Sequence, residues 1–146
     1  MRLKLHTDYA LRILLYLSAS SRDDWIQGAH VADTFQISKG HILKVIQRLA
    51  GLGYVKTKRG VGGGTRLANE PKQIRLGRLI SELENEDVLA CVGEEDSSCF
   101  LHSRCRLRSA IREAQDVFYK ALDQYTLEDI SVEPSILISQ LPILKN

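Results

Sequence analysis

The chain has 146 residues, and its hydrophobic content of 44% is sufficient for the core of one small globular domain with an appendage. No apolar run has the length of a transmembrane helix, because the longest, Ile136 to Leu144, is interrupted by Gln140 and Pro142. The first residues lack the pattern of a signal peptide, so we expect a cytoplasmic protein without a membrane partner.

Positive charge is concentrated in the first half of the chain. Residues 1–70 carry eleven Lys and Arg against five Asp and Glu, a net charge of +6, whereas residues 71–146 carry nine against thirteen, a net charge of −4. A basic half is the electrostatic pattern expected of a surface that binds nucleic acid. Many solvated surfaces have a similar excess of positive charge, so the assignment of a nucleic-acid-binding surface depends on the sequence motifs.

The first predicted helix begins at Thr7, whose hydroxyl is expected to cap it, and runs to about Ser20. Asp8 lies in the first turn, where the helix dipole favours a negative charge, and this is a sufficient structural reason for an acid there. The apolar stripe of this helix consists of Ala10, Ile13, Leu14 and Leu17.

Two further helices with a tight turn between them predict a helix-turn-helix. The first runs from about Gly28 to Phe35 with Ala29, Ala32 and Phe35 on its buried face, and the second from Lys39 to about Ala50 behind a Ser38 cap. The buried stripe of the second helix consists of Ile42, Val45, Ile46 and Leu49. Its polar face offers Ser38, Lys39, His41 and Lys44 to base edges, with Gln47 and Arg48 further along, toward DNA backbone or a neighbouring element.

Two short strands, Tyr54 to Lys58 and Thr65 to Ala68, are expected to form a hairpin directly after the second of these helices. Four glycines in the six residues 59–64 make a tip that a DNA backbone can approach closely. The hairpin is therefore a wing, and Lys58, Arg59 and Gly60 are its expected DNA contacts in the minor groove or at phosphates. It lacks the Gly-Lys-Ser/Thr ending of a nucleotide-binding loop.

The second half contains a helix from about Leu76 to Glu84 and a long helix from about Arg104 to Tyr125. Apolar residues of the long helix recur at heptad spacing: Leu107, Ile111, Ala114, Phe118, Ala121 and Tyr125. This seam predicts a partner helix and hence a homodimer, which would match palindromic double-stranded DNA. A short helix near Leu127 follows.

The expected fold class is mainly α-helical with a small β-hairpin, and the chain divides into four parts. They are a winged helix-turn-helix DNA-binding domain (residues 1–84), a cysteine-containing cluster-binding loop (85–105), a dimerisation helix (106–130) and a tail (131–146), either disordered or lying on the partner.

All three cysteines lie between the two C-terminal helices, as Cys91, Cys99 and Cys105 with C-x7-C-x5-C spacing. The segment has no sustained apolar period, and three thiolates binding a soft metal or an iron–sulfur cluster would order it. An odd cysteine count argues against structural disulfides. A metal-free thiol switch and a zinc site that includes His102 remain open, although zinc sites usually contain a C-x2–4-C pair.

Several of these features together resemble one family. They are the start Met-Arg-Leu-Lys-Leu-His-Thr-Asp-Tyr-Ala-Leu-Arg, the helix opening Ser38-Lys39-Gly40-His41, the Lys58-Arg59-Gly60 wing with its following glycines, and three cysteines before a long helix. The set resembles, over residues 1–130, the dimeric winged-helix regulators of the Rrf type that carry an iron–sulfur cluster. Within them it is most similar to the nitric-oxide-sensing NsrR group.

The resemblance implies a repressor whose [4Fe–4S] cluster reacts with nitric oxide, which releases nitric-oxide stress promoters. It implies that Cys91, Cys99 and Cys105 are the ligands, with Asp8 of the partner subunit as a fourth and Arg12 as the neighbour of that acid. A carboxylate is a harder, weaker iron ligand than a thiolate, so that iron would be the more easily attacked by a small diatomic molecule.

The alternative within this family is a [2Fe–2S] regulator of cluster biogenesis or redox response, of the IscR group. Members of that group space three cysteines by five and five and place a histidine ligand three residues after the last. Here the first spacing is seven and the histidine position is Arg108, although His102 could serve as another fourth ligand. No catalytic triad, metal-hydrolase helix or nucleotide loop is present, so we do not expect an enzyme.

Overall fold

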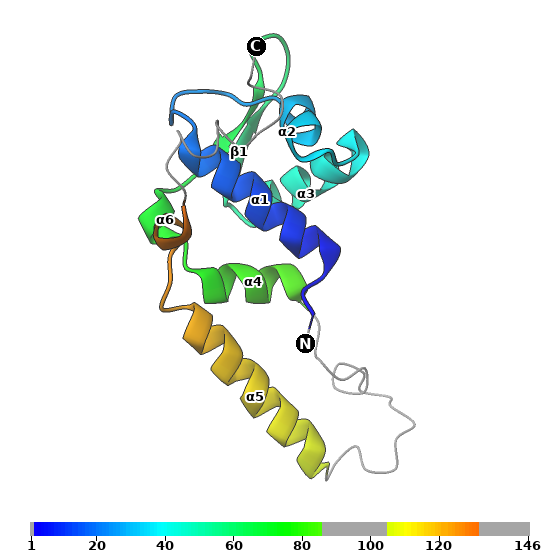
Figure 1. The fold of residues 1–146 in the computed structure, drawn as a ribbon, viewed down its shortest axis with the longest axis vertical. Helices are drawn as coiled ribbons and strands as arrows, with labels where there is room; N and C mark the ends of the chain where they lie inside the picture. The colour runs from blue at the N-terminus through cyan, green and yellow to red at the C-terminus, as the bar shows by residue number, and fades with distance from the viewer. Residues whose placement is uncertain (1, 86–104, 132–146) are drawn as a thin grey trace.

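The structure, a computed structural model, describes residues 2–85 and 105–131. Its elements are α1 (Leu5–Ala19), α2 (Gly28–Phe35), α3 (Lys39–Gly51), β1 (Val55–Lys58), β2 (Gly64–Leu67), the 3-10 turn η1 (Pro71–Gln73), α4 (Leu76–Glu84), α5 (Arg106–Leu122) and α6 (Leu127–Ile130). In Figure 1, α1, α2, α3 and the hairpin form a head, α4 crosses beneath it, and α5 extends away from it. The fold is mainly helical with one antiparallel hairpin, as predicted.

The core of the head lies where α1, α3 and α4 meet. The stripe predicted for α3 is correct, since Ile42, Val45, Ile46 and Leu49 are all buried. The largest fully buried side chains come from the same helices and their neighbours: Ile13, Leu14, Ile42, Leu49, Ile74, Leu79, Leu83 and Leu127. Each such side chain contributes roughly 1.5–3 kcal/mol through burial, and this fixes the position of α3 relative to α1 and α4.

Two details of the first helices differ from the predictions. Helix α1 begins at Leu5, so Thr7 lies inside its first turn; Thr7 is fully buried, and its Oγ1 caps no backbone amide. In α2 the buried residues are Val31, Ala32 and Thr34, whereas Ala29 and Phe35 are only partly buried. Thr7 cannot cap α1 because the helix begins two residues before it, and the buried face of the short helix α2 depends on the elements packed against it rather than on its own period.

Helix α5 is shorter than predicted at its carboxyl end. It ends at Leu122, and Tyr125 lies beyond it, where its carbonyl oxygen accepts a hydrogen bond of 2.9 Å from the amide of Leu76. The chain turns there to start α6, whose Thr126 caps the helix through the amide of Asp129. The last residue of the predicted seam therefore belongs to the α4–α5 junction.

The junction between α4 and α5 depends on Gly77. A Cβ atom at this position would collide with the carbonyl oxygen of Tyr119 and would lie 2.6 Å from Cβ of Asp123. Next to it, the amide of Arg78 donates a 3.0 Å hydrogen bond to Oδ1 of Asp123. The backbones of the two helices can approach this closely only because residue 77 has no side chain.

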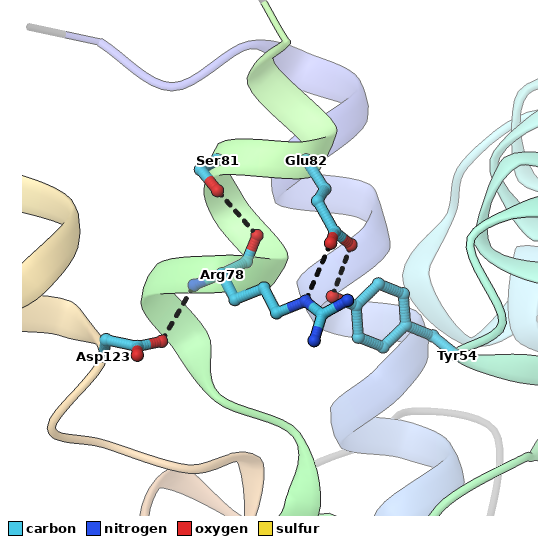
Figure 2. A network of polar contacts seen from close by, with 5 residues as sticks. All are labelled: Tyr54, Arg78, Ser81, Glu82 and Asp123. Atoms are coloured by element: carbon cyan, nitrogen blue, oxygen red, sulfur yellow. Dashed lines mark hydrogen bonds and ion pairs between the residues drawn. The ribbon is translucent and has the colours of Figure 1, made fainter. Parts of the chain in front are cut away.

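A second junction joins α4 to the base of the wing (Figure 2). The hydroxyl of Tyr54 donates a 2.7 Å hydrogen bond to Oε2 of Glu82, and Nε of Arg78 donates one of 2.8 Å to Oε1. Burial raises the pKa of Tyr54 above its ordinary value, and the bond to Glu82 raises it further. Burial opposes the ionisation of Glu82, but its bonds with Arg78 and Tyr54 outweigh this and lower the pKa of that carboxyl.

Replacing Gly77 by alanine should destabilise the protein by about 1–3 kcal/mol, because the added methyl group forces α4 and α5 apart. Urea unfolding followed by circular dichroism measures this loss. Gly51→Ala is the matched control, since a Cβ there meets no atom within 4 Å. The control should be neutral or stabilising by up to about 1 kcal/mol. Equal stability of the two variants would show that the α4–α5 contact is not close-packed.

Replacing Tyr54 by phenylalanine should cost about 1–2 kcal/mol at neutral pH, because Glu82 loses a hydrogen bond. The raised pKa of Tyr54 means that its contribution is full below pH 10.0, the ordinary tyrosine value, and is lost as the pH rises above it. Urea unfolding across this range should therefore show the stability gap between wild type and variant closing. Tyr125→Phe, at a residue that is 54% exposed, should follow the wild-type curve. A gap that stays constant would contradict the assignment.

Candidate nucleic-acid interface and metal-binding segment

Helix α3 presents its predicted polar residues on the surface of the head. The Ser38 hydroxyl accepts a hydrogen bond of 3.4 Å from the amide of His41, as expected of an N-cap. Ser38, Lys39, His41 and Lys44 are all exposed. The turn before α3 is tight because Gln36 adopts a left-handed conformation with φ of 54°. The four side chains are therefore exposed on a helix whose apolar stripe is fixed in the core.

Two further residues, Leu43 and Tyr9, lie beside these polar side chains. Leu43 is 52% exposed between Lys39 and Lys44, although it is a large apolar residue. The ring of Tyr9 from α1 lies with its centroid 6.3 Å from that of His41. The helical period did place Leu43 off the buried stripe, but the contact of Tyr9 depends on how α1 crosses α3, for which the sequence carries no signal.

Arg48 lies further along α3, two turns after His41, and binds the end of α4. Its Nη2 donates hydrogen bonds to the carbonyl oxygens of Glu82, at 3.1 Å, and Leu83, at 2.9 Å. The prediction that Arg48 contacts a neighbouring element is therefore confirmed, and Gln47 remains exposed.

The same end of α4 receives two residues that precede or open α1. Nζ of Lys4 donates to the carbonyl oxygen of Glu84 at 2.8 Å, and Nε2 of His6 lies 3.0 Å from that of Leu83. The last carbonyls of a helix have no partner within it, and cationic groups there are favoured by the helix dipole. The carboxyl end of α4 is thus held by both α1 and α3.

The predicted DNA-contacting residues of the wing are exposed, and the hairpin is also bonded to the segment after α1. Lys58, Arg59 and Gly60 are exposed, and Gly60 has a φ of 88°, which a side chain would disfavour. The hairpin is joined to the segment after α1 by two backbone hydrogen bonds between Ile26 and Thr65, of 3.0 and 2.7 Å. Trp25, just before this bridge, lies against the hairpin. Its role was not predicted, because a single tryptophan ahead of a strand has no characteristic spacing.

Asp8 and Arg12 form an ion pair one turn apart on α1, with Nε of Arg12 3.0 Å from Oδ2 of Asp8. Both side chains are close to half exposed, at 44% for Asp8 and 48% for Arg12. The carboxylate is therefore accessible from outside the subunit, and its second oxygen is not used by this ion pair.

Cys105 is the predicted thiolate ligand that falls within the described residues; Cys91, Cys99 and the alternative ligand His102 lie outside them. It occupies the N-cap of α5, where its sulfur accepts a 3.4 Å hydrogen bond from the amide of Arg108. The amino end of a helix favours negative charge, and the thiolate is the form of cysteine that binds metal. Cys105 thus fits a ligand role. Residues 2–85 and 105–131 contain no group of three or more His, Cys, Asp or Glu side chains arranged to hold a metal.

Helix α5 has no buried residue within the described part of the chain. Of the predicted seam, Leu107 is 61% exposed, Ala114 and Ala121 are exposed as well, and Ile111 and Phe118 are only partly buried. The apolar seam predicted for this helix is thus left largely uncovered. In the same part of the chain, no helix combines the length and the apolar character needed to cross a bilayer.

The sequence and the fold match known proteins over almost the whole chain. Residues 3–133 match the Rrf2 family model, described as an iron-dependent transcriptional regulator. The HTH-type transcriptional regulator NsrR of Geobacillus kaustophilus is 39% identical over 142 residues, which cover 97% of each chain. The HTH-type transcriptional repressor NsrR of Streptomyces coelicolor is 40% identical over 137 residues, covering 92% of this chain and 91% of the relative.

A solved structure agrees with these sequence matches. CymR, the global cysteine regulator of Bacillus subtilis, superimposes with a TM-score of 0.67 at 27% identity, covering 90% of this chain and 96% of CymR. The winged-helix fold and a role in transcription regulation rather than catalysis are thereby confirmed. The chain belongs to the Rrf2 family of iron-dependent transcriptional regulators.

Proposed function

We propose that this protein is a homodimeric repressor that binds palindromic promoter DNA and releases it when nitric oxide reacts with a [4Fe–4S] cluster. The single observation that carries the proposal is the bonding at the carboxyl end of α4. Arg48 of α3 and Lys4, just before α1, bind the last carbonyls of α4, and the segment that begins after Asn85 contains Cys91 and Cys99. The names of the NsrR relatives support the same function.

In this proposal, α3 enters the major groove and the wing grips the adjacent backbone. Ser38, Lys39, His41 and Lys44 share one exposed surface of α3 and carry donors and acceptors suited to base edges. Lys58 and Arg59 supply positive charge, and Gly60 allows close approach of the wing to a sugar–phosphate backbone.

Cys91, Cys99 and Cys105 would hold the cluster, with Asp8 of the partner subunit as fourth ligand. The group would supply an iron site that reacts with nitric oxide. The position of Cys105 at a helix amino end and the half-exposed carboxylate of Asp8 support this assignment. Arg12 would remain the neighbour of this carboxylate, since its ion pair uses only Oδ2 of Asp8.

The uncovered apolar seam of α5 supports a dimer in which α5 packs against its copy. A ligand supplied from the partner's α1 would connect the two heads through the cysteines. A conformational change in the cysteine segment would then be transmitted to α3 through the end of α4. The segment follows α4 in the chain, and Arg48 of α3 binds the last carbonyls of that helix. This gives the head two arrangements whose populations the cluster biases.

Replacing Arg59 by glutamine should weaken binding to DNA of any sequence and reduce the slope of log affinity against log salt by about one unit, because one phosphate contact is lost. Fluorescence anisotropy with a labelled promoter duplex over a range of salt concentrations measures this slope. Lys72→Gln, an equal charge change on the exposed Pro71–Gln73 turn, should leave the slope unchanged. An unchanged slope in the Arg59 variant would remove the wing tip from the interface.

The cluster assignment is tested by purifying the protein without oxygen and titrating nitric oxide while DNA binding is followed. We expect a broad brown absorption band that disappears together with DNA binding. Alanine variants of Cys91, Cys99 and Cys105 should each be colourless, whereas His102→Ala should keep the colour. Asp8→Ala should alter the response to nitric oxide more than the iron content, since three thiolates remain.

Other spectra would overturn the cluster type. A red, multi-peaked [2Fe–2S] spectrum lost in His102→Ala would assign the protein to the biogenesis or redox branch. A colourless protein that still binds DNA would leave a thiol switch or a zinc site, which metal analysis distinguishes.

A further inference from the structure

The aromatic ring of Trp25 lies beneath two cations of the wing. Cζ of Arg66 is 4.5 Å from the ring centroid and Nζ of Lys58 is 5.9 Å from it. Both distances are within the range of cation–π attraction, in which the negative face of the ring stabilises a positive charge. Trp25 is the only tryptophan of the chain and is partly buried.

The strand register explains why these cations need such a support. Lys56 lies directly opposite Arg66, and Lys58 follows two residues later on the same strand, so all three project from one face of the hairpin. Like charges opposite one another destabilise a strand pair. A ring under Arg66 and Lys58 offsets this repulsion and limits the directions that their side chains can take.

The position of the ring is fixed by the backbone that follows it. Ile26 exchanges two hydrogen bonds with Thr65, and the neighbouring Gly64 allows the close approach, since a Cβ there would lie 2.6 Å from the carbonyl oxygen of Ile26. Trp25 is therefore attached to the stem of the wing and cannot move independently of β2.

We propose that Trp25 is a positioning residue for DNA binding, which holds Arg66 and Lys58 as fixed phosphate-binding cations at the stem of the wing. Arg66 is then a DNA contact in addition to the residues of the wing tip. The ring contributes because a cation that is already held in place loses less side-chain freedom on binding a phosphate. The proposal concerns the wing alone and does not depend on the metal or on the signal.

The test measures binding to a fluorescein-labelled mixed-sequence duplex over a range of salt concentrations. Trp25→Leu should lower the affinity about fivefold, as expected from the loss of exposed cation–π contacts. It should also reduce the salt slope by about one unit. Trp25→Phe keeps an aromatic face and should restore most of the affinity, which a purely apolar packing role would not require. Circular dichroism checks that each variant is folded.

A double-mutant cycle shows whether Trp25 acts through the cations. In a background with Arg66→Gln and Lys58→Gln, the further change Trp25→Leu should have little effect, because the groups that it positions are absent. Equal effects of Trp25→Leu in the two backgrounds would overturn the proposal. An unchanged salt slope in Trp25→Leu alone would overturn it as well.

The fluorescence of Trp25 in the wild-type protein gives a test that does not depend on whether the variants fold. Since Trp25 is the only tryptophan, its emission reports on the stem of the wing, and it should change with the same affinity as the anisotropy signal when DNA is added. An emission that stays constant at saturating DNA would remove the stem from the interface. Failure of the wild type to bind any duplex would instead overturn DNA binding itself.

Discussion

The carboxyl end of α4 is the contact on which the arrangement of the head and the cysteine segment depends. A helix ends with carbonyls that have no internal partner, and leaving them buried and unbound costs free energy. Here Arg48 and Lys4 bind them, so α3 and the residues that lead into α1 converge on the last turn before the cysteine segment. The other end of α4 is packed against α5 at Gly77. Helix α4 is thus a short connector between the proposed DNA-binding surface and the proposed dimer helix.

This arrangement explains why the polar residues of α3 divide into two groups. Those near its amino end, such as Lys39 and His41, are exposed, whereas Arg48 is committed to α4. In the proposed complex, α3 would contact DNA near its amino end, while Arg48 near its carboxyl end connects it to α4. The network of Tyr54, Glu82 and Arg78 adds a parallel link from the base of the wing to the same helix.

Much of the head follows from the sequence because its signals are local. The period of Ile42, Val45, Ile46 and Leu49, with Ser38 as cap, specified α3, and the glycines of the hairpin specified the wing. Thr7 was wrong as a cap because α1 begins two residues before it, at Leu5. Trp25 and Tyr9 were missed because their contacts join segments far apart in the chain. The ligand set rests on Cys91 and Cys99, which lie outside the described residues, so it remains a prediction.

The hydrogen bond from the amide of Arg108 to the sulfur of Cys105 has an electronic consequence. Hydrogen bonds to a ligating sulfur help to set the reduction potential of an iron–sulfur cluster, because they stabilise the more negative, reduced form. In a cluster bound through Cys105, the first turn of α5 would raise this potential through a backbone group, which only the change Arg108→Pro would remove. Fraying of that turn would lower it again, so the redox behaviour of the metal would report on how well the helix is formed.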